Sequence, residues 1–226
     1  MPAAAETAAS SPATGRPVPA AFLMRFEVDL PRLGDGALSP PFDLPDAAAL
    51  PTFADLDGQP RFAAVAVGWT PAGLAVRVVA DGKTKAPRAN AKAPGEGDGL
   101  HLWIDTRPTG TAHRAGRYCR RFALLPSTGR MKKPGVYEVP ITQGGPATLA
   151  EALPVPVSAA VRADGYDLDA FLPAAHLPGF EPERSGVIAL HTLVSDAELG
   201  EQPLTVGAAF PTAHDPSTWT RAALAG

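Results

Sequence analysis

The chain has 226 residues, of which 45% are hydrophobic and 19% are charged, and a net charge of −3 at pH 7. An acidic chain is a poor nucleic-acid binder, so we expect no nucleic-acid partner. No run of about 18 apolar residues exists that could cross a membrane, so we expect no membrane span. The single cysteine, Cys119, excludes an internal disulfide, and no secretory leader is recognisable, so we expect a cytoplasmic protein.

The first residues differ in composition from the rest. Residues 1–20 are mainly Ala, Pro, Ser and Thr, and they cannot bury enough apolar surface to offset the entropy of ordering, so we expect a disordered tail. From 21 to 226, short apolar runs alternate with prolines and glycines, and few show a helical period. We therefore expect a single β-sandwich domain over 21–226, because all-β domains of this size are often undivided.

Two hairpins are predicted. The first joins RFAAVAVGW (61–69) to LAVRVVA (74–80) through a Pro-Gly turn, and the second spans 157–173 around the turn ADG. Between them, the loop 81–99 has no apolar anchor larger than alanine, so we expect it to be exposed and mobile.

The remaining segments also indicate strands. Residues 100–105 and 117–126 are predicted as neighbours, and 135–141 is a weaker strand that Pro140 restricts to an edge or an end. After a single helical turn at 173–177, the long apolar run 185–196 predicts a central strand, and 215–225 a turn followed by a strand. Nine or so short strands with minimal helix predict an all-β protein, an antiparallel β-sandwich with immunoglobulin-like or jelly-roll-like layers.

The strand in GDGLHLWIDTR (97–107) has two different faces. Its aliphatic residues alternate with His101, Trp103 and Asp105, so one face enters a core and the other presents an imidazole, an indole and a carboxylate. If Phe122 and Leu124 of the neighbouring strand enter the same core, then Arg117, Cys119, Arg121 and Ala123 share the polar face. In the alternative register, Tyr118 and Arg120 take their place.

This face is a candidate binding surface. An indole beside imidazole and guanidinium groups can stack on a ring-shaped ligand and bind its anionic oxygens, which makes His101, Trp103, Arg117 and Arg121 candidate ligand-binding residues. Asp196, which ends the strand 185–196, is a further candidate. The alternative is that Trp103 packs beneath the long loop and His101 is neutral and hydrogen-bonded.

Cys119 lies in a segment with four arginines between residues 114 and 121. Positive charge favours the thiolate, so Cys119 is a candidate reactive thiol if exposed, or a small buried hydrophobe if not. Together with His113 it could supply two zinc ligands, but a zinc site needs three or four, so we expect no metal.

Charge is unevenly distributed along the chain. Residues 83–133 contain 12 Lys and Arg against three acids, whereas 134–226 contain three bases against 11 acids. The basic segment could dock an anionic ligand or an acidic protein partner, or the two segments could pair with each other in the folded protein.

Five motifs occur in the order found in a known family: VGWTPAGLAV, GDGLHLWIDTR, GYDLDAFLPAAHL, GVIALHTLVSD and DPSTW. Together they cover about 61–220 and resemble carbohydrate-binding module family 9 and the wider DOMON-like sandwiches. The resemblance implies a β-sandwich that holds a saccharide between two tryptophans, one in the loop before the GDG strand and one just before DP.

The sequence departs from this pattern at the stacking positions. The loop 81–96 has no aromatic residue, Ala213 and His214 precede Asp215, and His101 stands where the family has a glutamate. None of the three methionines matches the haem ligand of the DOMON group, so we expect no cofactor.

We expect no enzyme. Asp98 and Asp105 lie at opposite ends of one strand, more than about 20 Å apart and too far for a glycosidase pair, and no G-x-S-x-G motif is present. The sequence predicts a non-enzymatic β-sandwich that binds a carbohydrate or another polar or anionic small molecule on one sheet face. The alternative is an interaction domain that docks an acidic protein.

Overall fold

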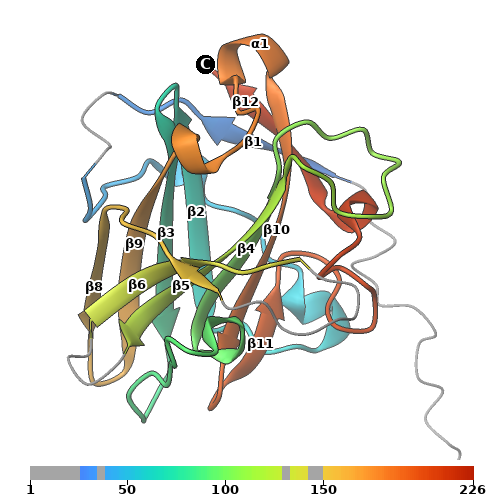
Figure 1. The fold of residues 1–226 in the computed structure, drawn as a ribbon. Helices are drawn as coiled ribbons and strands as arrows, with labels where there is room; N and C mark the ends of the chain where they lie inside the picture. The colour runs from blue at the N-terminus through green and yellow to red at the C-terminus, as the bar shows by residue number, and fades with distance from the viewer. Residues whose placement is uncertain (1–25, 35–38, 129–132, 142–149) are drawn as a thin grey trace, which may run out of the picture.

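The computed structural model describes residues 26–34, 39–128, 133–141 and 150–226. The tail expected over 1–20 lies outside the described residues. Two sheets face each other, one of eight strands and one of four (Figure 1). The expected all-β sandwich is confirmed. Among the described residues, no helix is long and apolar enough to traverse a lipid bilayer.

The eight-stranded sheet, called the large sheet below, has the order β1-β12-β10-β4-β5-β6-β7, with β11 paired to β10. The four-stranded sheet, called the small sheet, has the order β2-β3-β9-β8. The strands are β1 (Glu27–Pro31), β2 (Ala63–Thr70), β3 (Gly73–Asp81), β4 (Gly99–Asp105), β5 (Cys119–Thr128), β6 (Lys133–Glu138), β7 (Glu151–Ala152), β8 (Val157–Val161), β9 (Gly165–Pro173), β10 (Val187–Asp196), β11 (Gly200–Pro203) and β12 (Thr220–Ala225).

Helical structure within the described ranges is limited to short turns. One α-helix, α1, has four residues, and the other helical elements there are 3-10 turns, among them the turn predicted at 173–177. The helical elements are η2 (Asp46–Ala48), η3 (Ala54–Asp57), η4 (Pro94–Glu96), η5 (Ala174–His176), α1 (Pro182–Ser185) and η6 (Pro216–Thr218).

Both predicted hairpins are confirmed. β2 and β3 pair from Thr70↔Gly73 outward, and β8 and β9 pair from Val161↔Tyr166 outward. The strand predicted over 185–196 is β10, which lies between β12 and β4 and is therefore central, as its apolar composition indicated. Figure 1 shows the small-sheet strands β8, β9, β3 and β2 side by side.

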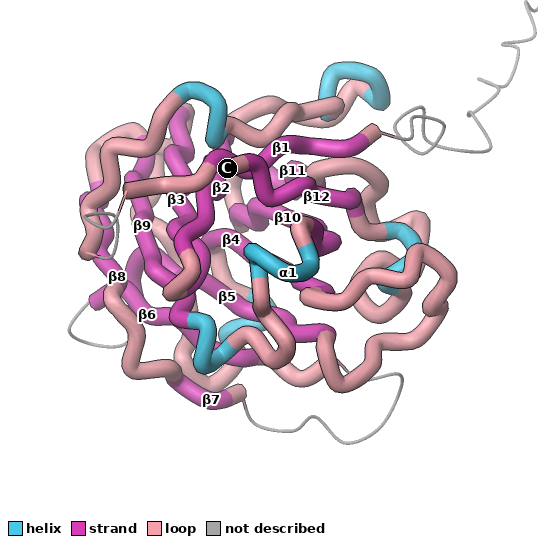
Figure 2. The backbone as a smooth tube through the Cα atoms, turned by 90° about the horizontal axis from the view of Figure 1, so that it is seen from above, coloured by secondary structure: helices cyan, strands magenta, loops and turns pink. Residues whose placement is uncertain are grey.

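The main core lies between the two sheets. Leu100, Leu102 and Ile104 of β4 are fully buried there, together with apolar residues of β3 and β9 such as Val78 and Leu168. The view from above shows loops gathered along the other side of the large sheet (Figure 2). These loops form a second, smaller layer over the outer face of the sheet.

Two expectations need correction. The loop 81–99 is not exposed throughout, because Lys83 and Pro94 are buried and η4 forms within it. The strand β1 was not predicted, and it pairs with β12 in the parallel direction, so the sandwich is not purely antiparallel.

Gly99 starts β4 in a conformation that favours glycine. Its φ is +144°, and a Cβ at this position would lie 2.2 Å from the Leu124 carbonyl oxygen. We expect Gly99→Ala to lower the free energy of unfolding by about 1–3 kcal/mol, measured by urea denaturation. Gly116, which has open space around it, is the matched control, and Gly116→Ala should change stability by less than about 0.5 kcal/mol. Equal effects of the two substitutions would contradict the account of this strand start.

Candidate binding site

The outer face of the large sheet carries the polar and aromatic side chains of β4. Residues Gly99–Asp105 are all buried, so β4 is covered on both sides. Its aliphatic residues enter the main core, whereas Trp103 belongs to a separate apolar cluster with Cys119, Ala189 and Trp219. The period-two pattern therefore divides the strand between two cores.

The predicted register with β5 is confirmed. Trp103 lies opposite Arg121 and Leu102 lies opposite Phe122, so Arg121 shares the face of Trp103. The Arg121 guanidinium carbon lies 4.7 Å from the centre of the indole ring, which is a cation–π distance.

A second imidazole joins from β10. His191 pairs with Trp103, and their ring centres are 5.5 Å apart, while the ring of His101, two residues earlier on β4, is centred 6.3 Å from that of Trp103. Sequence reasoning missed His191, which stands inside the apolar run of 185–196. The period-two alternation that was applied to β4 could have found it. Applied to β10, this alternation places His191 on the outer face of the sheet with Ala189 and Leu193. The four side chains His101, Trp103, Arg121 and His191 are called the Trp103 face below.

Loop backbone covers the Trp103 face. The His101 Nε2 donates to the Gly97 carbonyl at 3.3 Å, and an Arg121 Nη2 donates to the Gly95 carbonyl at 3.2 Å. From the opposite side, the indole Nε1 of Trp103 donates to the Ala213 carbonyl at 3.0 Å. As a result His101 and Trp103 are only 1% and 2% exposed. The expectation of an open binding surface was wrong, because these loops lie on it.

The Trp103 face has buried nitrogen atoms without partners. The Nδ1 atoms of His101 and His191 and the Nε of Arg121 have no hydrogen-bond partner among the described residues. Because a carbonyl only accepts, His101 carries its proton on Nε2 and its Nδ1 is an acceptor. A buried polar atom left unpaired costs about 1–3 kcal/mol, so each of these atoms has a free hydrogen-bonding position at this face.

Both imidazoles are held neutral. Burial lowers the pKa of His101 to about 4, and the nearby Arg121 guanidinium acts in the same direction. Burial alone lowers the pKa of His191 to about 4. At neutral pH the Trp103 face therefore offers uncharged imidazoles beside one guanidinium.

Three other candidate residues lie away from this arrangement or differ from expectation. Arg117 precedes β5, is exposed, and stacks on Tyr118 at 4.6 Å, so it does not share the Trp103 face. Cys119 is buried, and burial raises the pKa of its thiol, which argues against a reactive thiolate. Asp196 points to the other side of β10, where it binds Lys83.

Lys83 is the centre of a buried ion cluster at the ends of β4 and β10. Its side chain is 2% exposed, its Nζ contacts Asp196, and it lies 3.5 Å from Asp98. The Asp98 carboxylate also accepts from the backbone N–H groups of Arg88 and Ala197, each at 2.9 Å. The cluster thus ties the loop 81–99 to the end of β10 and holds it against the sheet.

His113, Asp215 and Ser217 lie close together but do not form a catalytic triad. The Ser217 hydroxyl donates to Asp215 at 2.6 Å, and both residues contact the same atom of His113, Nδ1. A triad requires the serine and the acid on different ring nitrogens, so that the imidazole relays a proton between them. Asp215 instead caps η6 by accepting from the Ser217 backbone N–H at 3.0 Å.

Ion pairs within the fold join part of the basic segment 83–133 to the acidic segment 134–226. Basic side chains of 83–133 pair with acids of 134–226 in the contacts Lys83–Asp196, Arg107–Glu181 and Arg120–Glu138. Of the two interpretations of the charge pattern, pairing within the fold accounts for these bases. Among the described residues, no three His, Cys, Asp or Glu side chains are grouped as metal ligands would be.

Solved structures confirm the fold. The chain is similar to a family 9 carbohydrate-binding module from Caldicellulosiruptor kristjanssonii in complex with cellotriose, with a TM-score of 0.58 and 12% identity over 89% of this chain and 94% of that one. A module of the same family and organism in complex with glucose gives 0.55 and 15%, over 90% and 96%. A protein from Bacteroides uniformis gives 0.51 and 10%, over 88% and 98%.

No protein-family model matches the sequence, and no curated protein matches it. The structural matches define the class of fold, a divergent sandwich of the family 9 type. Identities of 10–15% show the fold alone, so the ligand is a separate question.

We expect Lys83→Met to destabilise the protein by about 3–5 kcal/mol, because the substitution leaves Asp98 and Asp196 buried without their counter-charge. Lys85 is the matched control, since it is exposed and only its backbone N–H contacts Glu198. Lys85→Met should change the free energy of unfolding by less than about 0.5 kcal/mol. Similar denaturation midpoints for the two variants would show that the buried cluster does not hold the loop.

The lowered pKa values of His101 and His191 predict a loss of stability in acid. Below pH 6.5 the unfolded chain binds a proton at each histidine while the folded protein does not, so stability falls as the pH falls toward about 4. Each histidine contributes a slope of about 1.4 kcal/mol per pH unit near pH 5. His191→Leu should reduce the slope of unfolding free energy against pH by that amount, and an unchanged slope would contradict the buried neutral imidazole.

Proposed function

We propose that the protein is a non-catalytic binding module and that the Trp103 face takes up a carbohydrate or another polar or anionic small molecule. The observation that carries the proposal is the group of three buried nitrogen atoms without partners around one indole. A sugar suits these groups because its hydroxyls can donate to imidazole nitrogens and accept from a guanidinium, while its C–H surface packs on the indole.

The ligand has to enter by displacing loop backbone. Arg121 is partly exposed and Gly95, to which it donates, is partly exposed as well, so the entrance lies on the Arg121 side. A ligand oxygen can replace the Gly95 carbonyl as the partner of the guanidinium. Movement of the segment around η4 then opens the way to Trp103 without change in the sheet.

The fold supports this assignment at a general level. Two solved structures of the same fold hold cellotriose and glucose. The two stacking tryptophans that the family resemblance implies have no counterpart in the sequence segments 81–96 and 213–214 of this chain. Trp103, which is contributed by the sheet itself, supplies the aromatic surface in this proposal.

The test is calorimetric titration with glucose, cellotriose and glucose 6-phosphate, followed by the same titration of Arg121→Gln. Removing the guanidinium should weaken binding about tenfold or more, because a hydrogen bond to a charged group contributes about 1.5–3 kcal/mol. Arg117→Gln removes the same charge from a nearby exposed residue off the Trp103 face and should leave the affinity unchanged.

Two results would overturn the proposal. If both variants bind as the wild type does, the ligand lies elsewhere. If none of the three compounds binds, while the protein co-purifies in a fixed ratio with an acidic protein whose binding Arg117→Gln weakens, the interaction domain is the better account.

A further inference from the structure

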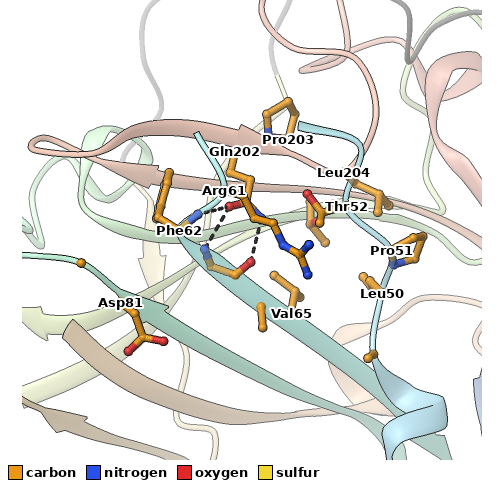
Figure 3. Close-up of a pocket in the computed structure, with 15 residues that line it drawn as sticks. Leu50, Pro51, Thr52, Arg61, Phe62, Val65, Asp81, Gln202, Pro203 and Leu204 are labelled. Carbon is orange, nitrogen blue, oxygen red and sulfur yellow. Dashed lines mark hydrogen bonds between the residues drawn. The ribbon is translucent and has the colours of Figure 1, made fainter. Parts of the chain in front are cut away.

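A cleft that shares no residue with the Trp103 face lies where strands of the small and the large sheet meet. It has a volume of about 510 Å³ and lies between the start of β2, the end of β3 and β11. Small-molecule sites have volumes of about 300–1,000 Å³. Its lining includes apolar groups such as Leu50, Pro51 and Leu204 and polar groups such as Thr52 and Gln202 (Figure 3).

Gln202 fixes one wall of this cleft. Its side chain is buried, its Oε1 accepts from the backbone N–H groups of Phe62 and Ala63 at 2.8 and 2.9 Å, and its Nε2 donates to the Ala63 carbonyl at 2.7 Å. The carboxamide thus takes the place of a neighbouring strand at the edge of β2. The backbone next to Arg61 is therefore held in one position.

Arg61 supplies an unpaired charge. Its guanidinium reaches into the cleft toward Thr52 and Val65 (Figure 3). No hydrogen bond, ion pair or ring contact joins Arg61 to another residue within the described part of the chain. The other charged group of the lining, Asp81, is already paired with Arg162. The cleft therefore has a net positive charge at the Arg61 end.

We propose that this cleft binds a saccharide that carries a carboxylate, with the carboxylate on the Arg61 guanidinium. The planar fork of arginine matches a carboxylate in two parallel hydrogen bonds. The alternation of hydroxyl and carboxamide groups with apolar surface suits a sugar ring, which presents hydroxyls at its edge and C–H groups on its faces. A purely apolar carboxylate would leave the Thr52 hydroxyl of the lining without a ligand partner.

This site is separate from the Trp103 face and does not depend on it. The experiment is a titration of ¹⁵N-labelled protein with glucuronate, with glucose and hexanoate as matched probes that lack the carboxylate or the hydroxyls. We expect glucuronate to shift the backbone amide signals of residues 61–65 and 82, and both control probes to bind at least about tenfold more weakly.

Arg61→Gln should reduce the affinity for glucuronate at least about tenfold while leaving the thermal unfolding temperature unchanged, because Arg61 is exposed and unpaired. Arg184→Gln, which removes an exposed arginine of α1, is the matched control and should bind as the wild type does.

Three results would overturn the proposal: no shifts with glucuronate, equal binding of glucose or hexanoate, or unchanged glucuronate binding by Arg61→Gln. Arg121→Gln separates the two sites. If that substitution abolishes glucuronate binding and Arg61→Gln does not, the ligand occupies the Trp103 face, so the cleft proposal fails and the proposed function stands.

Discussion

The strand β4 is buried on both faces, and this constraint determines the character of the candidate site. One face contributes Leu100, Leu102 and Ile104 to the core of the sandwich. The other carries His101 and Trp103, which the loops cover. On an open sheet the imidazole, indole and guanidinium groups would be hydrated by water. Under the loops each of these groups is uncharged, hydrogen-bonded to loop backbone, or has a nitrogen atom without a partner. All three outcomes occur at the Trp103 face.

Buried ion pairs, and not apolar packing alone, hold the covering loop 81–99 in place. The loop 81–99 has little apolar surface of its own, and Lys83 anchors it to Asp98 and Asp196 at the end of the sheet. Burying an ion pair costs desolvation energy, so such a cluster contributes more to fixing one arrangement than to net stability. The carboxylates also accept from the backbone N–H of Arg88 in the loop and from those of Ala197 and Glu198 in the turn after β10, which fixes the loop against that turn. A ligand that enters near Gly95 leaves this anchor in place.

Period-two patterns were sufficient to predict most strands and the pairing of β4 with β5, because each strand has one clearly apolar face. They also placed Arg121 beside Trp103. They could not show that the face is covered, since the covering atoms are backbone carbonyls of Gly95, Gly97 and Ala213, which no side-chain pattern marks. Lys83 was overlooked because a lysine in a polar loop is usually solvated. The cleft at Arg61 is formed by segments distant in sequence, and no local motif predicts it.

Loops close the Trp103 face over two neutral imidazoles, and this closure can be tested in solution. Its most direct test is an NMR titration of the ¹⁵N-labelled imidazole rings of His101 and His191. The account predicts that both rings keep the chemical shifts of the neutral form from pH 7 down to pH 5, since their pKa values are lowered to about 4. Protonation of both rings with midpoints near the ordinary histidine value of about 6.5 would show that the face is open to water and would contradict the account.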